Sequence, residues 1–144
     1  MSAARSGPDR WEHFEHGADI GVRGIAATKA GAFEQAALAL TAVVTDPARV
    51  AATTAVDIGC DAPDDELLLA HWLNAVASEM AARRMLFGRF EVQLDGHHLH
   101  GRAWGEAASA ARHEPAVEVK GATCTELRVA PHALGWLAQT VVDV

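Results

Sequence analysis

The densest group of side chains that could carry chemistry lies in the segment from Glu12 to Asp19, which holds two histidines, two glutamates and one aspartate. Carboxylate oxygens suit hard cations such as calcium or magnesium, and histidine together with aspartate could also take zinc or manganese. His13 and His16 lack the flanking sequence and helical spacing of a zinc protease motif. The spacing by itself therefore favours a loop with solvated polar groups over a metal site.

A second concentration of charge lies at the end of the sequence, where Asp143 precedes Val144. An aspartate beside a free C-terminal carboxylate places two negative charges within a few ångströms, which is costly unless a cation or solvent relieves it. Taken alone, such a tail is typical of a solvated chain end.

Other polar residues point less clearly to chemistry. His98 and His100 share one face of a predicted strand while His97 lies in a turn, so we do not expect the three to converge on a metal. Lys120 reads as a solvated strand residue and His113 as a loop residue. Phosphate-binding glycine loops and nucleophile motifs are missing from the sequence, which favours a protein that is not an enzyme.

Two helices are predicted to hold these segments in place. Apolar residues recur at helical spacing between Thr28, which can cap a helix, and Asp46-Pro47, which ends it. A second helix is expected between the acidic Asp64 and the basic Arg84, because acidic side chains at the start of a helix and basic side chains at its end interact favourably with the helix dipole. Alternating patterns predict strands over 20–26, 55–60, 89–95, 99–103, 117–120, 126–129 and 136–144, with a hairpin at Asp95-Gly96.

This order of elements suggests an α+β fold: a two-layer sandwich with two helices packed on one face of a mostly antiparallel mixed sheet. Residues 1–10 are expected to form a flexible leader and residues 11–144 one domain. The 144 residues carry 12 basic and 19 acidic side chains, a formal charge of -7, which disfavours direct nucleic-acid binding and suits a divalent cation or a basic protein partner. The apolar runs are too short for a membrane helix, so we expect a cytoplasmic protein.

Several segments resemble, in the same order along the chain, the archease family. They are 11–21, 32–40 with Thr45-Asp46, 65–68 with 72–74, Gly105-Glu106 ahead of His113, 118–123 with 127–129, and the terminal Asp143-Val144. The resemblance spans Trp11 to Val144.

The resemblance implies a non-enzymatic activator of a GTP-dependent RtcB-type RNA ligase, which promotes ligase guanylylation and multiple turnover in tRNA splicing and RNA repair. It also implies a divalent cation, commonly calcium with magnesium or manganese possible, held by Asp19, Asp143 and Val144. Lys120 and His16 are then candidate contacts to the nucleotide or the ligase.

Two other functions stay open at this point. A stand-alone metal-dependent hydrolase could use His13, His16 and Asp19, because such ligands with an open position can activate water. The other function is that of an interaction module that a bound metal ion merely stabilises.

Overall fold

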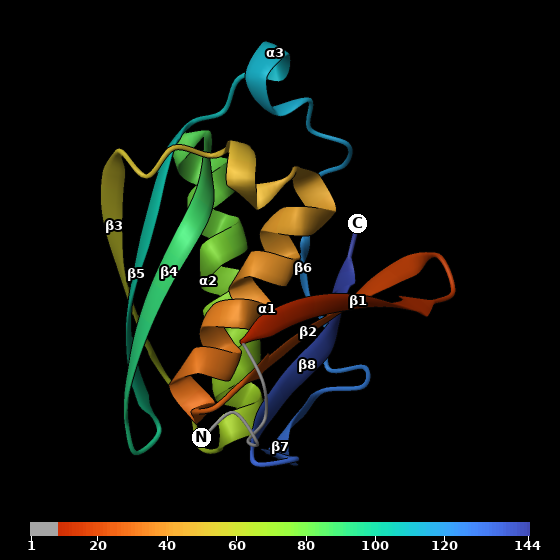
Figure 1. Ribbon diagram of the computed structural model, residues 1–144, viewed down its shortest axis with the longest axis vertical. Helices are drawn as coiled ribbons and strands as arrows, with labels where there is room; N and C mark the ends of the chain where they lie inside the picture. The colour runs from red at the N-terminus through yellow and green to blue at the C-terminus, as the bar shows by residue number, and fades with distance from the viewer. Residues whose placement is uncertain (1–8) are drawn as a thin grey trace.

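The computed structural model describes residues 9–144, and two long helices run through its centre (Figure 1). They are α1 (Lys29–Val44) and α2 (Asp65–Arg83). The Thr28 hydroxyl accepts the Gly31 amide at 2.9 Å, and the Asp64 carboxylate accepts the Leu67 amide at 2.8 Å. Each side chain thus satisfies a backbone donor that the first turn leaves free. Both predicted helices and their starting residues are confirmed.

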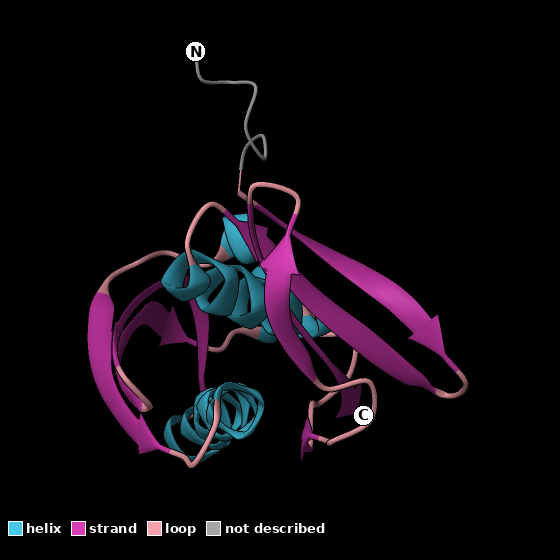
Figure 2. Cartoon of the chain, turned by 90° about the horizontal axis from the view of Figure 1, so that it is seen from below, coloured by secondary structure: helices cyan, strands magenta, loops and turns pink. Residues whose placement is uncertain are grey.

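The strands form two antiparallel sheets that lie on either side of the helices (Figure 2). The larger has the order β1 (Arg10–His16), β2 (Asp19–Ala26), β8 (Gly135–Asp143) and β6 (Gly121–Ala122), with β7 (Arg128–His132) also pairing with β8. The smaller has the order β3 (Thr54–Asp61), β5 (His98–Ala107) and β4 (Met85–Asp95). Short helical turns are η1 (Pro47–Arg49) and α3 (Ala110–His113).

The predicted α+β class is confirmed, and the structure adds that the strands divide between two sheets. The reason lies in α1, where ten of the sixteen residues are buried. A helix that is apolar around most of its circumference needs cover on more than one side. Accordingly, α1 packs against β2 and β8 of the larger sheet and against β4 of the smaller one.

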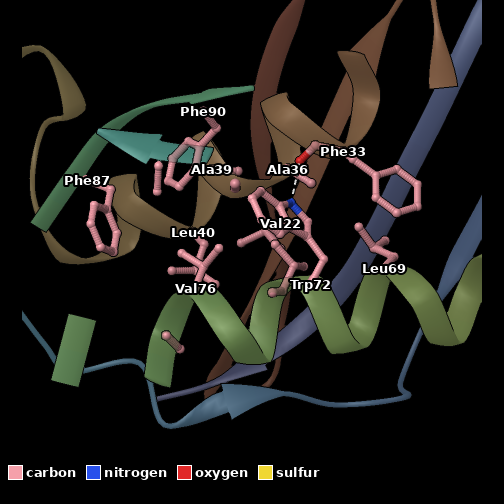
Figure 3. Close-up of a cluster of buried hydrophobic side chains, with 14 of the residues drawn as sticks. Val22, Phe33, Ala36, Ala39, Leu40, Leu69, Trp72, Val76, Phe87 and Phe90 are labelled. Atoms are coloured by element: carbon pink, nitrogen blue, oxygen red, sulfur yellow. Dashed lines mark hydrogen bonds between the residues drawn. The ribbon is translucent and has the colours of Figure 1, made fainter. Parts of the chain in front are cut away.

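A single apolar core joins the helices to both sheets, and Trp72 lies in it fully buried (Figure 3). Its indole N–H donates to the carbonyl of Phe33 at 3.1 Å, which ties α2 to α1. Phe90 of β4 meets the Trp72 ring edge-on, with centroids 6.0 Å apart. The N–H of this buried indole is thus satisfied within the core, as a buried indole requires.

β2 approaches α1 closely at Gly24. A Cβ atom there would lie 2.1 Å from the carbonyl oxygen of Ala32 and 2.4 Å from the amide nitrogen of Ala36. Both are backbone atoms of α1, which cannot move aside cheaply. Glycine at this position therefore sets how closely α1 packs on the larger sheet.

Two predictions of local structure, in separate parts of the chain, are wrong. Residues 114–120, expected to contain the clearest strand, have no regular structure, and only Gly121 and Ala122 pair with β8. The Ala116 amide donates instead to the carbonyl of Val44 at the end of α1, at 2.8 Å. The segment thus crosses from a helix end to a sheet edge, and Pro115 lacks the amide that a central strand needs.

The second wrong prediction concerns the start of the chain. The segment expected to be a loop before the first strand forms β1 and a tight turn. Of the predicted leader, residues 1–8 lie outside the described residues, whereas Arg10 already begins β1. None of the helices in residues 9–144 is both long enough and apolar enough to cross a membrane.

Candidate metal centre

The β1–β2 hairpin carries the histidine- and carboxylate-rich segment and projects from the body of the protein (Figure 1). Its turn consists of Gly17, with a φ of +60°, and Ala18. His16 and Asp19 face each other across this turn as the last pair of the ladder. Asp19 is therefore the first residue of β2, at the end of the larger sheet.

The register of β2 with β8 brings the distant end of the chain to the same place. Ile20 and Val142 form the last pair of this ladder, so Asp19 and Asp143 are the residues that come next on β2 and β8. The Lys120 amide donates to the carbonyl of Asp143 at 2.8 Å, and Val144 follows directly. Backbone pairing therefore places His16, Asp19 and Asp143 at the same end of the larger sheet, with Lys120 and Val144 next to Asp143.

The two aspartates have the chemistry of ligands for a hard cation. Within residues 9–144, neither carboxylate accepts a hydrogen bond or forms an ion pair. Asp19 is half-buried and Asp143 is exposed. Carboxylates that no protein group satisfies remain available to calcium, magnesium or manganese, so the donor set fits such an ion.

A cation here would need a third oxygen donor besides the two aspartates. In the described part of the chain, no group of three or more His, Cys, Asp or Glu side chains is arranged to hold a metal ion. Val144, which directly follows Asp143, is the third residue that the family resemblance selects, and its main-chain oxygen is a further hard donor. A hollow of about 420 Å³ lined by 13–15 and 17–20 opens next to Asp19 and leaves room for a ligand or water.

The structure separates the residues of the proposed hydrolase site. His13 and His16 are three positions apart on β1, so their side chains leave opposite faces of the strand. The His13 ring nitrogen Nε2 lies 2.7 Å from the carbonyl oxygen of Ala39 in α1, which commits that ring to a structural hydrogen bond. His13, His16 and Asp19 thus do not converge on one metal ion.

An ion pair stiffens the outer face of the hairpin. The Arg23 guanidinium donates to Glu12 and to Gln139 of β8, both at 2.9 Å, and lies over the Phe14 ring. The hydrogen bond from Arg23 lowers the pKa of Glu12 below its usual value. These contacts tie β1 to β2 and β8 and so help to hold Asp19 in register.

Sequence reasoning missed the role of His113, which is 1% exposed and ends α3. Its Nδ1 accepts the Ser109 amide at 2.9 Å, so the ring proton resides on Nε2 and is donated to Glu106, also at 2.9 Å. Glu106 further accepts from the Ala51 amide and from Arg112. Three donors around one carboxylate make this a structural clamp, and no local pattern in the sequence signals it.

The three histidines near the β4–β5 turn behave as the sequence predicted. His97, His98 and His100 are exposed, and each faces a different aspartate: Asp65 at 3.8 Å, Asp61 at 2.7 Å and Asp57 at 4.0 Å. They do not share a site. Cys60 and Cys124 are both free thiols, and burial raises the pKa of Cys60.

Fold and site together define a small α+β protein in which two antiparallel sheets enclose two helices and one sheet end gathers oxygen donors from both termini of the domain. Residues 11–144 match the family model described as the archease protein family. The chain belongs to this family.

Similar proteins agree with this assignment over nearly the whole chain. The protein archease of Pyrococcus furiosus is 36% identical over 140 residues, covering 94% of this chain and 99% of that protein. Protein archease of Thermococcus gammatolerans is also 36% identical, with the same coverage. The solution structure of Methanobacterium thermoautotrophicum protein 1598 superposes with a TM-score of 0.80 at 28% identity, covering 93% of this chain and 98% of that one.

Proposed function

We propose that this protein activates a GTP-dependent RtcB-type RNA ligase and is not itself an enzyme. It would speed guanylylation of the ligase and sustain its turnover in tRNA splicing and RNA repair, in the cytoplasm. The proposal rests on membership of the archease family and on the residues that the family resemblance selects.

One observation supports the proposal most directly: the β2–β8 ladder ends at Ile20 with Val142, so Asp19 and Asp143 follow at the same sheet end, and the Lys120 amide donates to the Asp143 carbonyl. These residues come from three distant parts of the sequence. At one sheet end they would offer a divalent cation a set of hard oxygen ligands.

Each residue would have a distinct role in the complex with the ligase. Asp19, Asp143 and Val144 would hold calcium, or magnesium or manganese in its place. A bound cation supplies positive charge next to the nucleotide triphosphate. Lys120, which is exposed, would contact phosphate or the ligase, and the exposed His16 would lie at the same contact.

The test is to incubate a RtcB-type ligase with GTP and manganese, with and without this protein, and to follow guanylylated ligase over time. We expect acceleration at substoichiometric amounts. Asp143→Asn should reduce the stimulation by at least roughly tenfold, since even changes around metal ligands typically cost that much.

The matched control is Asp95→Asn, which removes one exposed carboxylate from the smaller sheet, away from the site. It should stimulate the ligase as the unchanged protein does. No acceleration by the unchanged protein at any ratio would rule out the proposal. Persistent activation by Asp143→Asn would instead make the carboxylate cluster structural.

A further inference from the structure

The segment that carries Lys120 has little regular structure to hold it. Residues 114–120 form no strand or helix, and β6, which follows, is only two residues long. Val119 is buried in the core on one side of Lys120. Since two paired residues contribute little stability by themselves, something else must fix the backbone on the other side.

That support comes from Asn74 on the exposed side of α2. Its side-chain oxygen Oδ1 accepts the Ala122 amide at 2.8 Å. The strand β6 uses one edge to pair with β8, through Gly121 with Asp143 and Ala122 with Val142. Asn74 therefore satisfies a donor that β8 leaves free, so that β6 is held from both sides.

The fit between Asn74 and β6 depends on the glycine beside it. A Cβ atom at Gly121 would lie 2.7 Å from Oδ1 of Asn74, closer than such contacts normally come. A side chain at position 121 would push the amide out of hydrogen-bonding range. The two residues are thus matched in space, although 47 positions separate them in the sequence.

The hydrogen bonds around β6 continue directly to the candidate metal centre. The Lys120 amide donates to the Asp143 carbonyl at 2.8 Å, and the Thr123 amide donates to the Val141 carbonyl at 2.9 Å. The Thr123 hydroxyl also donates to the Val141 carbonyl, at 2.8 Å. Residues 120–123 are therefore held against β8, and Asn74 anchors the middle of this stretch to a rigid helix.

We propose that Asn74 is a positioning residue that holds Lys120 beside Asp143 through β6, with Gly121 leaving the space it needs. The inference deepens the proposed function and rests on it, because it makes the docking of β6 on α2 a condition for Lys120 to contact the nucleotide or the ligase. Asn74 itself touches neither Asp19 nor Asp143 by any hydrogen bond within residues 9–144.

The first test measures the backbone directly and needs no partner. Asn74→Leu removes the acceptor but keeps the branched shape of the side chain and its number of heavy atoms, while Asn74→Asp keeps an oxygen in place. Amide hydrogen exchange followed by NMR should be faster at Ala122 and Lys120 in Asn74→Leu, by at least about fivefold, the usual value of one hydrogen bond. Asn74→Asp should exchange like the unchanged protein.

Ser78→Leu is the matched control, because Ser78 is exposed on the same helix one turn later. It should leave exchange at Ala122 unchanged. Titration with manganese alone should give the same affinity in Asn74→Leu as in the unchanged protein, since within residues 9–144 the Asn74 side chain hydrogen-bonds to Ala122 and to none of the proposed ligands.

The second test follows ligase guanylylation. Asn74→Leu should lose stimulation as Lys120→Ala does. The double variant should lose no more stimulation than the less active of the two single variants, because both substitutions act through the Lys120 side chain. Asn74→Asp should stimulate the ligase as the unchanged protein does.

The outcomes separate the two proposals. If the unchanged protein fails to stimulate the ligase, the proposed function is wrong, and the exchange measurement still decides whether Asn74 holds β6. Unchanged exchange at Ala122 in Asn74→Leu would overturn the inference. So would full stimulation by Asn74→Leu when Lys120→Ala is inactive.

Discussion

At the scale of single residues, the surroundings of each carboxylate decide what it can do. Glu106 accepts hydrogen bonds from the Ala51 amide, from His113 and from Arg112, and these donors lower its pKa to about 2. Among residues 9–144, Glu34 accepts only the Val92 amide, and burial raises its pKa. Asp19 and Asp143 accept none within residues 9–144. The Glu106 carboxylate is occupied by structural hydrogen bonds, whereas the carboxylates of the two aspartates remain available to a ligand.

The clamp on Glu106 predicts a specific dependence of stability on pH. The pKa of Glu106 is about 2 in the folded protein and 4.5 without its partners, so its ionised form stabilises the fold above pH 4.5. That contribution is lost as the pH falls from 4.5 towards 2. Glu106→Gln should therefore be less stable at pH 7 and show a shallower loss of stability on acidification, measured by urea unfolding.

An exposed carboxylate provides the comparison. Glu91→Gln, on the open face of β4, should keep the pH dependence of the unchanged protein. Equal pH profiles for Glu106→Gln and the unchanged protein would contradict the clamp.

At the scale of elements, the position of the larger sheet depends on how closely β2 approaches α1. This distance also places Asp19, because Asp19 begins the strand that contains Gly24. The packing and the candidate metal centre thus share one strand. A change that separates β2 from α1 should disturb both.

Gly24→Ala tests this packing. The added Cβ would collide with the backbone at Ala32 and Ala36, so we expect a loss of roughly 1 to 3 kcal/mol or more in the free energy of unfolding, as overpacked cores show. Gly59→Ala in β3 is the control, since the nearest atom to its new Cβ would be 4.0 Å away. It should be neutral or slightly stabilising. Equal stabilities of the two variants in urea would contradict this account of the packing.

At the scale of the whole molecule, the candidate metal centre connects the first hairpin of the domain with its last strand. A cation held by Asp19 and Asp143 would link β2 to the end of β8, and a ligand that binds only the folded state stabilises that state. Cation binding and global stability should therefore rise together.

Thermal unfolding measures this linkage. At free calcium about 100 times the Kd, stabilisation should reach about 2.7 kcal/mol, a rise in Tm of roughly 5 to 10 °C for a domain of this size. A chelator should reverse the rise, and Asp143→Asn should not show it. A Tm that calcium leaves unchanged at millimolar concentration would contradict a specific site there.

Much of the fold could be predicted because its signals are local. Thr28 and Asp64 cap their helices through bonds that span three residues, and the β4–β5 hairpin follows from Asp95-Gly96. The strand predicted near 117–120 failed for the opposite reason. Its alternating pattern is real, but Ala116 and Lys120 find their hydrogen-bond partners in Val44 and Asp143, which no local pattern reveals.

The sequence by itself determined the helices, most of the strands and the α+β class, and through a family resemblance it predicted which residues would form the candidate metal centre. Only the tertiary structure decided that the strands form two sheets, that His113 is buried against Glu106, and that Asn74 supports β6. These features depend on contacts between residues far apart in the chain. Local propensity does not encode such contacts, because burial and hydrogen-bond satisfaction are settled only when the whole chain packs.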